Sequence, residues 1–248
     1  MKIAVLSDIH GNLLALESVM DDIQKNNCEK LLFLGDYALA GPEPGDTVNF
    51  CMSFSKRDNV EMIQGNTDEM IANYSEEVFN NVAKNAPIMA NALKEEANTL
   101  SKHQIEFLRD LPAQKSLTID GVKILMVHGS PRRNNEDIMP DTPLEEVEKM
   151  LSGVKEDLIL CGHTHIPCGF QTNTRQTVLN DGSVGRPFTE NPEACYAIVT
   201  TFGNGGFEVE HHFVKYDNVS AAKTLATRHF EGADKLAHML IHPTHRHF

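Results

Sequence analysis

Two histidines separated by one residue, His163 and His165, have the spacing that first suggests metal chemistry in this sequence. They follow an apolar run at residues 158–160 that has the character of a buried β-strand. Side chains at positions i and i+2 of an extended backbone leave on the same side, so two imidazole rings can converge where this strand ends. Two nearby histidines are often only polar surface residues. The metal interpretation therefore depends on whether other ligand types occur at other strand ends.

Potential metal ligands follow four more predicted strands, at the point where each strand ends. These strands are expected at residues 2–7, 30–34, 60–63 and 122–127. The side chains that follow them are Asp8 and His10, Asp36, Asn66, and His128. Each has an ordinary structural interpretation as well, such as a helix cap for Asp8, a turn for Asn66 or a satisfied core histidine. Those interpretations do not explain why all seven side chains follow strand ends, which share one edge in an open α/β sheet.

Seven ligands of this mixture suit a pair of metal ions. They are too many for one tetrahedral zinc, whereas two ions that share a bridging carboxylate leave positions open for water or substrate. Imidazole, carboxylate and carbonyl ligands without a thiolate fit Mn, Fe, Zn or Ni better than Cu(I), Mg or Ca. We therefore predict two divalent metal ions at this sheet edge, with manganese favoured.

Strands alternate with helices over the first part of the chain, which predicts parallel strands in a layered α/β protein. Helices are expected at residues 13–25 and 46–56. The strand signals then vanish at residues 69–111, which favour helices broken at Pro87. Because strands resume directly afterwards, we interpret this segment as a small helical insertion in one domain that spans residues 1–248.

The second half of the chain predicts further short strands and two more helices. Asp120-Gly121 is a strong two-residue hairpin signal between expected strands at 115–119 and 122–127. Ser101 and Gln104 have the spacing of a capping box, and Thr142-Pro143-Leu144-Glu145 predicts the start of a helix. Later strands are expected at residues 169–172, 177–179, 194–201 and 206–214, followed by one terminal helix at 217–240.

The composition excludes several classes of protein. Thirty-five acidic residues against 22 basic ones give a net charge of −13, which argues against extended binding to nucleic acid or to an anionic membrane. The sequence shows no signal peptide and no apolar run of membrane-spanning length. The five cysteines are widely spaced without a Cys-x-x-Cys motif, which predicts reduced thiols and a cytoplasmic location. If the substrate is an anion, bound cations must reverse the local charge.

Five short motifs occur in a fixed order and resemble those of the calcineurin-like metallophosphoesterases. They are Ser7-Asp8-Ile9-His10-Gly11-Asn12, Gly35-Asp36, Gly65-Asn66-Thr67-Asp68, His128-Gly129 and Gly162-His163-Thr164-His165. A later stretch at residues 179–187 resembles the compact bacterial phosphodiesterase branch of that superfamily. The resemblance implies a four-layer α-β-β-α sandwich, with the helical insertion as its least typical part.

The resemblance also implies how the ligands divide between the two ions. Asp8, His10 and His165 would hold the first ion. Asn66, His128 and His163 would hold the second, and Asp36 would bridge both. A hydroxide that also bridges the ions would be the nucleophile. Two divalent ions outweigh two carboxylates and one hydroxide, which leaves the pocket at about +1 and able to attract phosphate.

The function implied is a dinuclear-metal-dependent phosphoesterase that cleaves phosphodiester or phosphomonoester bonds of small molecules, with nucleotides among the candidates. One alternative is a dinucleoside polyphosphate hydrolase or nucleotidase. Another is a non-catalytic metal-binding scaffold, although scaffolds of this kind tend to lose ligands and all seven are present here. The oligomeric state stays open, with a dimer as one option, and the helical insertion could cover the site or form an oligomer contact.

Further catalytic and substrate-binding residues are predicted around these ligands. Thr67 stands where the family often has a histidine, and a threonine hydroxyl can donate a hydrogen bond but cannot protonate a leaving group near neutral pH. Leaving groups that need little protonation should therefore be preferred. The catalytic candidates are Asn12, Asp36, Asn66, Thr67 and Asp68. The candidate substrate contacts are Asn12, Arg132, Arg133 and Arg186, for which helix capping by Asn12 and solvated arginines are the alternatives.

Four histidines near the C-terminus also have metal-binding side chains. They are His238, His242, His245 and His247. They follow the residues expected to complete the fold, so we interpret them as a surface tail.

Overall fold

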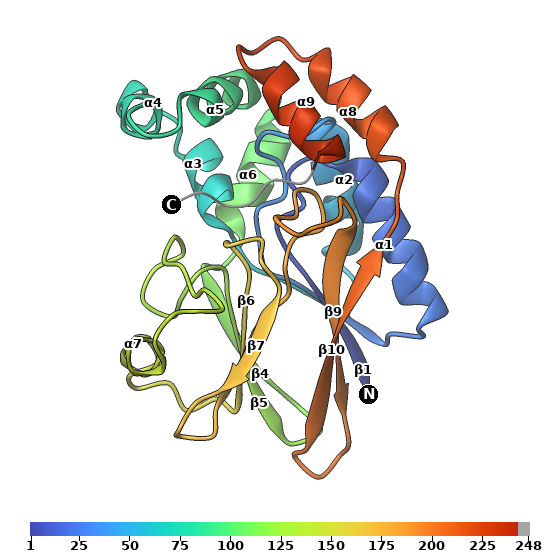
Figure 1. The fold of residues 1–248 in the computed structure, drawn as a ribbon, viewed down its shortest axis with the longest axis vertical. Coiled ribbons are helices and arrows are strands. Elements are labelled where there is room, and N and C mark those ends of the chain that lie inside the picture. Colours follow the sequence, from blue (N-terminus) through green and yellow to red (C-terminus); the bar gives the residue numbers. More distant parts are fainter. Residues whose placement is uncertain (243–248) are drawn as a thin grey trace.

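The computed structural model describes residues 1–242, in which ten strands form two five-stranded sheets (Figure 1). The first sheet has the order β10-β9-β1-β2-β3, with β10 at Phe207–Val214, β9 at Ala194–Thr201, β1 at Lys2–Leu6, β2 at Lys30–Phe33 and β3 at Val60–Met62. The second has the order β4-β5-β6-β8-β7, with β4 at Gln114–Ile119, β5 at Val122–Val127, β6 at Leu158–Cys161, β8 at Thr177–Asn180 and β7 at Cys168–Gln171.

Each sheet has a parallel centre. Strands β1, β2 and β3 pair in parallel in the first sheet, and β5, β6 and β8 do so in the second. The remaining pairings are antiparallel, including the β4–β5 hairpin that turns at Asp120-Gly121 as predicted. The carboxyl ends of β1 and β2 lie beside those of β5 and β6. Two hydrogen bonds show this: the His128 ring donates to the carbonyl of Leu34, and the amide of His163 donates to the carboxylate of Asp8.

Alternating side chains explain why the two sheets pack face to face. Ile3 and Val5 of β1 point into the core between the sheets, whereas Ala4 and Leu6 belong to the core on the helical side. Leu158 and Leu160 of β6 likewise face the inner core. Successive side chains of a strand point to opposite faces, so strands that are apolar on both faces must be covered on both.

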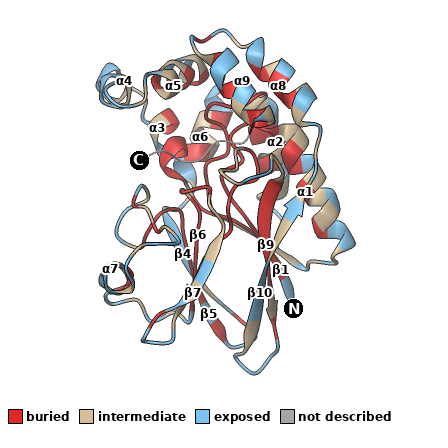
Figure 2. Cartoon of the chain, viewed as in Figure 1, coloured by how far each residue is buried: buried red, intermediate tan, exposed pale blue. Residues whose placement is uncertain are grey.

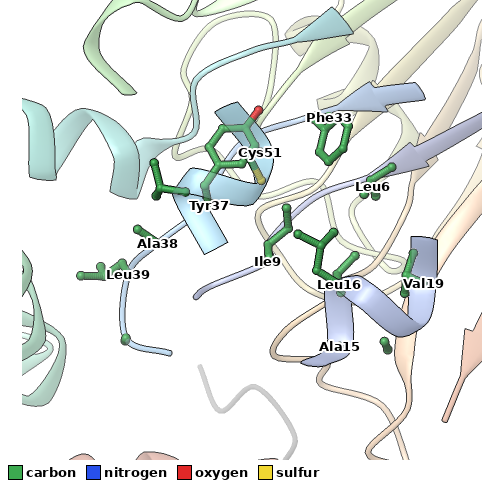
Figure 3. Packing of buried hydrophobic residues seen from close by; sticks show 14 of the residues in the cluster. Leu6, Ile9, Ala15, Leu16, Val19, Phe33, Tyr37, Ala38, Leu39 and Cys51 are labelled. Atoms are coloured by element: carbon green, nitrogen blue, oxygen red, sulfur yellow. The ribbon is translucent and has the colours of Figure 1, made fainter. Parts of the chain in front are cut away.

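Helices cover the outer face of each sheet. On the first sheet, α1 (Leu13–Lys25) and α2 (Pro44–Phe54) pack beside α8 (Asn218–Ala226) and α9 (Ala233–Ile241) (Figure 1). Figure 3 shows Ala15, Leu16 and Val19 of α1 lying near Leu6 and Phe33 of the strands. On the second sheet, α7 (Leu144–Met150) packs through its buried Val147 into the cluster that contains Val127 and Ile159. The predicted α-β-β-α layering is confirmed.

Four helices separate β3 from β4, where the sequence predicts a helical insertion. They are α3 (Asn66–Ala72), α4 (Glu76–Ala83), α5 (Pro87–Thr99) and α6 (Lys102–Asp110). The chain breaks at Pro87 and the capping box of Ser101 and Gln104 is present, as predicted. Helix α4 has no fully buried residue and is largely exposed, whereas parts of α5 are buried (Figure 2). Within residues 1–242, none of the helices is long and apolar enough to cross a membrane.

The prediction of one terminal helix at residues 217–240 is wrong. The single terminal helix is two helices, because the chain breaks at residues 227–232 and Gly232 has a φ of 95° that favours glycine. The helix start predicted at residues 142–145 is confirmed, because α7 begins at Leu144 with Pro143 as its cap. The hydroxyl of Thr142 accepts the amide of Met139.

The interpretation of the C-terminal histidines also needs correction. His238 lies within α9, whose buried Leu236 and Leu240 pack into the core, so the fold is not complete before it. His242 is the residue that ends α9 and is exposed. His245 and His247 lie outside the described residues.

Candidate metal centre

The predicted ligands gather where the strands of both sheets end. Asp8 and His10 follow β1, Asp36 follows β2, and Asn66 begins α3. From the second sheet, His128 follows β5, while His163 and His165 follow β6. Six of these seven residues are buried and His163 is partly exposed. The fold therefore brings ligands from two sheets into one cluster.

The backbone at this cluster is strained. Five of the seven residues have left-handed φ angles, namely Asp8 at 52°, His10 at 47°, Asp36 at 60°, His163 at 66° and His165 at 61°. Residues with a Cβ atom rarely adopt this conformation, which costs about 1–3 kcal/mol at each position. Strain of this kind persists only where packing enforces it, and it concentrates at functional sites.

The first group of ligand atoms comprises Asp8, His10 and His165. The Oδ1 atom of Asp8 lies 3.8 Å from Nε2 of His10 and 3.3 Å from Nε2 of His165, and the two nitrogens are 3.1 Å apart. Each imidazole donates its Nδ1 hydrogen to a backbone carbonyl, that of Leu39 for His10 and that of Arg186 for His165. The Nε2 atoms of the neutral rings are then acceptors that face one another and a carboxylate, an arrangement that a cation would stabilise.

The second group comprises Asp8, Asp36 and His128. Nε2 of His128 lies 3.4 Å from Oδ2 of Asp36 and 3.9 Å from Oδ1 of Asp8, and its Nδ1 donates to the carbonyl of Leu34. Oδ1 of Asn66 is 3.0 Å from the same Nε2. Oδ1 of Asp8 belongs to both groups, and within residues 1–242 this buried atom has no hydrogen-bond partner. Oδ2 of Asp36 is also 3.7 Å from Nε2 of His10, so two carboxylates lie between the groups.

His163 lies beside these groups and outside both. Its Nε2 is 3.3 Å from Oδ1 of Asp137, and its ring centroid is 5.3 Å from that of His128. Its backbone amide donates to Oδ2 of Asp8 over 2.9 Å. The backbone of His163 therefore orients the shared carboxylate, and its ring as a metal ligand stays a prediction.

Opposite charges at the centre stabilise one another. Burial opposes ionisation of both carboxylates, but the nearby imidazoles outweigh it and hold the pKa of Asp36 at about 2 and that of Asp8 well below its usual range. Burial opposes protonation of His128, but Asp36 and Asp8 raise its pKa to about 10. The ionised carboxylates thus favour positive charge here, and a bound cation would displace that proton.

Three residues outside the predicted site residues support Asp8, either directly or through Ser7. Oγ of Ser7 donates to Oδ2 of Asp8 over 2.6 Å and lies 2.9 Å from Oδ1 of Asp181, which is fully buried. A Cβ atom at Gly162 would lie 2.6 Å from Oδ2 of Asp8, so only glycine allows the loop after β6 to come this close. Asp181 follows β8, and the rule that selected the other strand-end ligands could have found it.

Three of the predicted catalytic residues differ in what they contact. The carboxylate of Asp68 accepts the backbone amides of Asp36, Tyr37 and Gly65 at 2.8–2.9 Å. The amide of Thr67 donates to Oδ1 of Asp36, while its buried Oγ1 has no hydrogen-bond partner in the described part of the chain. The side chain of Asn12 caps α1 and donates to the carbonyl of Gly185 and to Tyr216. Only Thr67 among these three lines the cavity of the centre.

That cavity has a volume of about 490 Å³, and its lining contains two chemically different sets of residues. One set comprises His10, Asp36, Asn66, His163 and His165. The other is apolar and includes Leu39, Met70, Val82, Met89 and Phe188, three of them from the helices between β3 and β4. The helical segment therefore forms a wall of the same cavity.

The predicted arginine contacts separate into two places. Arg186 lines the cavity, and its guanidinium lies 3.2 Å from the sulfur of Met89 without a salt bridge among residues 1–242; burial lowers its pKa to about 10. Arg132 and Arg133 both form ion pairs with Glu136 and line another hollow. Substrate binding by any of the three stays a prediction, and Arg186 has the better placement.

The two-sheet fold and its strand-end cluster define an α/β protein with a candidate dinuclear metal centre. The sequence model of the calcineurin-like phosphoesterase superfamily domain matches residues 1–204. The chain therefore belongs to the calcineurin-like phosphoesterase superfamily, as the motifs suggest, and is a metal-dependent phosphoester hydrolase.

Individual relatives agree with this assignment. An uncharacterized protein of Methanocaldococcus jannaschii is 29% identical over 232 residues, which cover 87% of this chain and 88% of that protein. The crystal structure of a hypothetical protein from Pyrococcus horikoshii has a TM-score of 0.85 at 24% identity, covering 98% and 99% of the two chains. That of a metallophosphoesterase from Sphaerobacter thermophilus has a TM-score of 0.77 at 22% identity, covering 97% and 98%. The structural likenesses establish the shared fold, and the bacterial branch stays a prediction.

Proposed function

We propose that this protein hydrolyses phosphodiester or phosphomonoester bonds of small molecules with two divalent metal ions held at the strand-end cluster. The observation that carries the proposal is the buried Oδ1 of Asp8. It lies within 4 Å of the Nε2 atoms of His10, His128 and His165 and has no hydrogen-bond partner among the described residues. A buried carboxylate oxygen that faces three imidazole nitrogens at these distances without a hydrogen bond is arranged to bind a cation.

The donor set fits such ions. It contains imidazole, carboxylate and amide oxygen ligands without a thiolate, which suits Mn, Fe, Zn or Ni, and we keep manganese as the favoured metal. Three imidazoles donate their Nδ1 hydrogens to carbonyls, so their Nε2 atoms are prepared as ligands. Asp8 and Asp36 each lie between the two groups, so either can supply the bridging carboxylate.

Thr67, Arg186 and Asp36 would each have a separate role in hydrolysis. Metal ions held by these ligands would lower the pKa of a water molecule and would neutralise charge on a phosphoryl group. Oγ1 of Thr67 is available to donate a hydrogen bond to a phosphoryl oxygen. Arg186 offers positive charge on the same cavity and forms no salt bridge within residues 1–242. The amide of Thr67 holds Oδ1 of Asp36 and leaves Oδ2 for the metal side.

The lining of the cavity favours a substrate in which an apolar or aromatic group is esterified to the phosphate. Leu39, Met70, Val82 and Met89 offer such a group a surface from which water is excluded. Arg186 is the one arginine or lysine among the described lining residues, whereas a polyphosphate chain would require several cations. We therefore place simple esters, nucleoside monophosphate esters included, ahead of dinucleoside polyphosphates.

The test combines metal content with a substrate panel. Protein stripped with a chelator should be inactive, and reloading with Mn²⁺ should give two ions per chain and restore hydrolysis, measured by elemental analysis and nitrophenolate release. Bis-nitrophenyl phosphate or nitrophenyl phosphate should exceed glycerol phosphate by about tenfold or more in kcat/KM, in line with burial of one aromatic group. Both should also exceed diadenosine tetraphosphate, whose polyphosphate chain would meet a single arginine in the lining. Protein that binds two ions but hydrolyses none of these would instead be the non-catalytic scaffold.

Thr67→His is expected to raise turnover on alkyl phosphates more than on nitrophenyl phosphates. A histidine can protonate an alkoxide leaving group, which typically contributes about 100-fold or more, whereas nitrophenolate leaves without protonation. The measurement is the ratio of kcat values on glycerol phosphate and nitrophenyl phosphate at saturating Mn²⁺. Thr67→Asn, which adds bulk without an acid, is the control. An equal effect on both substrates, or none, contradicts the role given to this position.

Location and assembly complete the proposal. We propose a cytoplasmic enzyme, which is supported by five cysteines that are all free thiols. The oligomeric state stays open, with a dimer as one option.

A further inference from the structure

The peptide group between Leu39 and Ala40 hydrogen-bonds both to the predicted ligand His10 and to Glu96, which pairs with Arg228 near the C-terminus. The carbonyl of Leu39 accepts the Nδ1 hydrogen of His10 over 2.7 Å, and the N–H of the same peptide group, that of Ala40, donates to Oε1 of Glu96 over 2.9 Å. Oε1 of Glu96 also accepts from Nη1 of Arg228 over 2.7 Å. We propose that Glu96 and Arg228 are positioning residues that orient His10 through the Leu39–Ala40 peptide.

The loop after β2 depends on the hydrogen bonds with Glu96 and Arg228 for its conformation. Ala40 has a left-handed φ of 68° although it is not glycine, and the loop around it has no helical or strand hydrogen bonding. Arg228 also donates to the carbonyl of Gly41, so one guanidinium and one carboxylate hold two successive parts of the loop. Without them, the peptide group could rotate and remove the carbonyl from His10.

The burial of the Glu96–Arg228 ion pair indicates that it fixes the geometry of the loop after β2. Glu96 on α5 is fully buried, and the side chain of Arg228, just after α8, is 9% exposed. A buried ion pair contributes little net stability, because desolvation offsets the attraction between its charges. It does fix geometry. Here the fixed geometry is that of the carbonyl that sets the tautomer and ring orientation of His10, the kind of support whose loss weakens metal affinity about 10- to 100-fold.

Glu95 provides a matched control within the same cluster. Its carboxylate pairs with the other terminal nitrogen of Arg228, and its Oε1 accepts the amide of His229. None of its hydrogen bonds in the described residues reaches the loop after β2. Glu95 and Glu96 thus share one arginine, and only Glu96 contacts the peptide of Ala40.

The experiment compares Glu96→Met with Glu95→Met, because methionine keeps the volume and removes the acceptor. Calorimetric titration of metal-free protein with Mn²⁺ should show affinity for one ion weakened about 10- to 100-fold in Glu96→Met, and within about threefold of wild type in Glu95→Met. Glu96→Gln should stay within about threefold, because its amide oxygen can replace Oε1 and its NH₂ group takes the place of Oε2, which has no partner within residues 1–242. Long-range ¹H–¹⁵N spectra should show that His10 loses its single tautomer in Glu96→Met alone.

Equal losses in the two methionine variants, or an unchanged affinity in Glu96→Met, would overturn the proposal. If Glu96→Met does not fold, Arg228→Met decides instead: a loss of about threefold or more supports the proposal and an unchanged affinity refutes it. The inference rests on the proposed metal centre. Wild-type protein that binds no Mn²⁺ would refute that centre, whereas wild-type binding with no difference among the variants would refute only the positioning role.

Discussion

Asp36→Asn is expected to lower kcat/KM for a nitrophenyl phosphoester by about 1000-fold or more, equivalent to about 4 kcal/mol of transition-state stabilisation. Oδ1 of Asp36 accepts the amide of Thr67, while Oδ2 lies 3.4 Å from Nε2 of His128 and 3.7 Å from Nε2 of His10. An asparagine would keep its oxygen on the Thr67 amide and turn its NH₂ group toward the metal positions. A donor in that place repels a cation, so elemental analysis should find fewer than two ions per chain.

Asp22→Asn is the matched control for this prediction. Asp22 also lies beside a histidine, with its Oδ2 3.6 Å from Nδ1 of His212, but it is on α1 and away from the cluster. The kcat/KM of the Asp22→Asn variant should stay within about threefold of wild type, as for most substitutions remote from a site. If Asp36→Asn retained two tightly bound ions and wild-type activity, the proposed centre would be wrong.

Asp68→Asn is expected to lower kcat/KM by about 10- to 100-fold, with part of the loss recovered at high Mn²⁺. Its carboxylate accepts three backbone amides, those of Asp36, Tyr37 and Gly65, and so joins the loop after β2 to the loop after β3. An asparagine has one oxygen, and its NH₂ group would face at least one of these donors. The two loops would separate, and both carry predicted ligands.

The same substitution should also lower the free energy of unfolding by about 1–3 kcal/mol, because a buried N–H loses its acceptor. Urea unfolding of metal-free protein measures this change, and Mn²⁺ titration measures the affinity. Asp217→Asn tests the same chemistry at an exposed helix cap, where Asp217 accepts the amide of Ser220, and it should leave the Mn²⁺ affinity unchanged. An Asp68→Asn protein with wild-type Mn²⁺ affinity would show that the loops do not depend on this carboxylate.

Local sequence was enough to predict most of the elements. Helix α1 and strands β5 and β9 have the predicted bounds, and the hairpin turns at Asp120-Gly121. These features depend on hydrogen bonds and side chains within a few residues. The prediction of a single terminal helix passed over Gly232, which is a local signal for a break. The chain breaks at residues 227–232, where Arg228 bonds to Glu96 of α5 and Gly232 lies against Ile88 of the same helix.

The sequence by itself determined which residue types follow the strands. Because the carboxyl ends of parallel strands lie at the same edge of a sheet, it also determined that these residues lie near one another. It could not determine how the ligands are held, because their partners are distant backbone groups and side chains. The carbonyl of Leu39 orients His10, the carbonyl of Arg186 orients His165, and the amide of His163 donates to Asp8. Only the tertiary structure decided these contacts, since left-handed backbone angles and buried hydrogen bonds depend on packing between segments as far apart as Asp8 and His165.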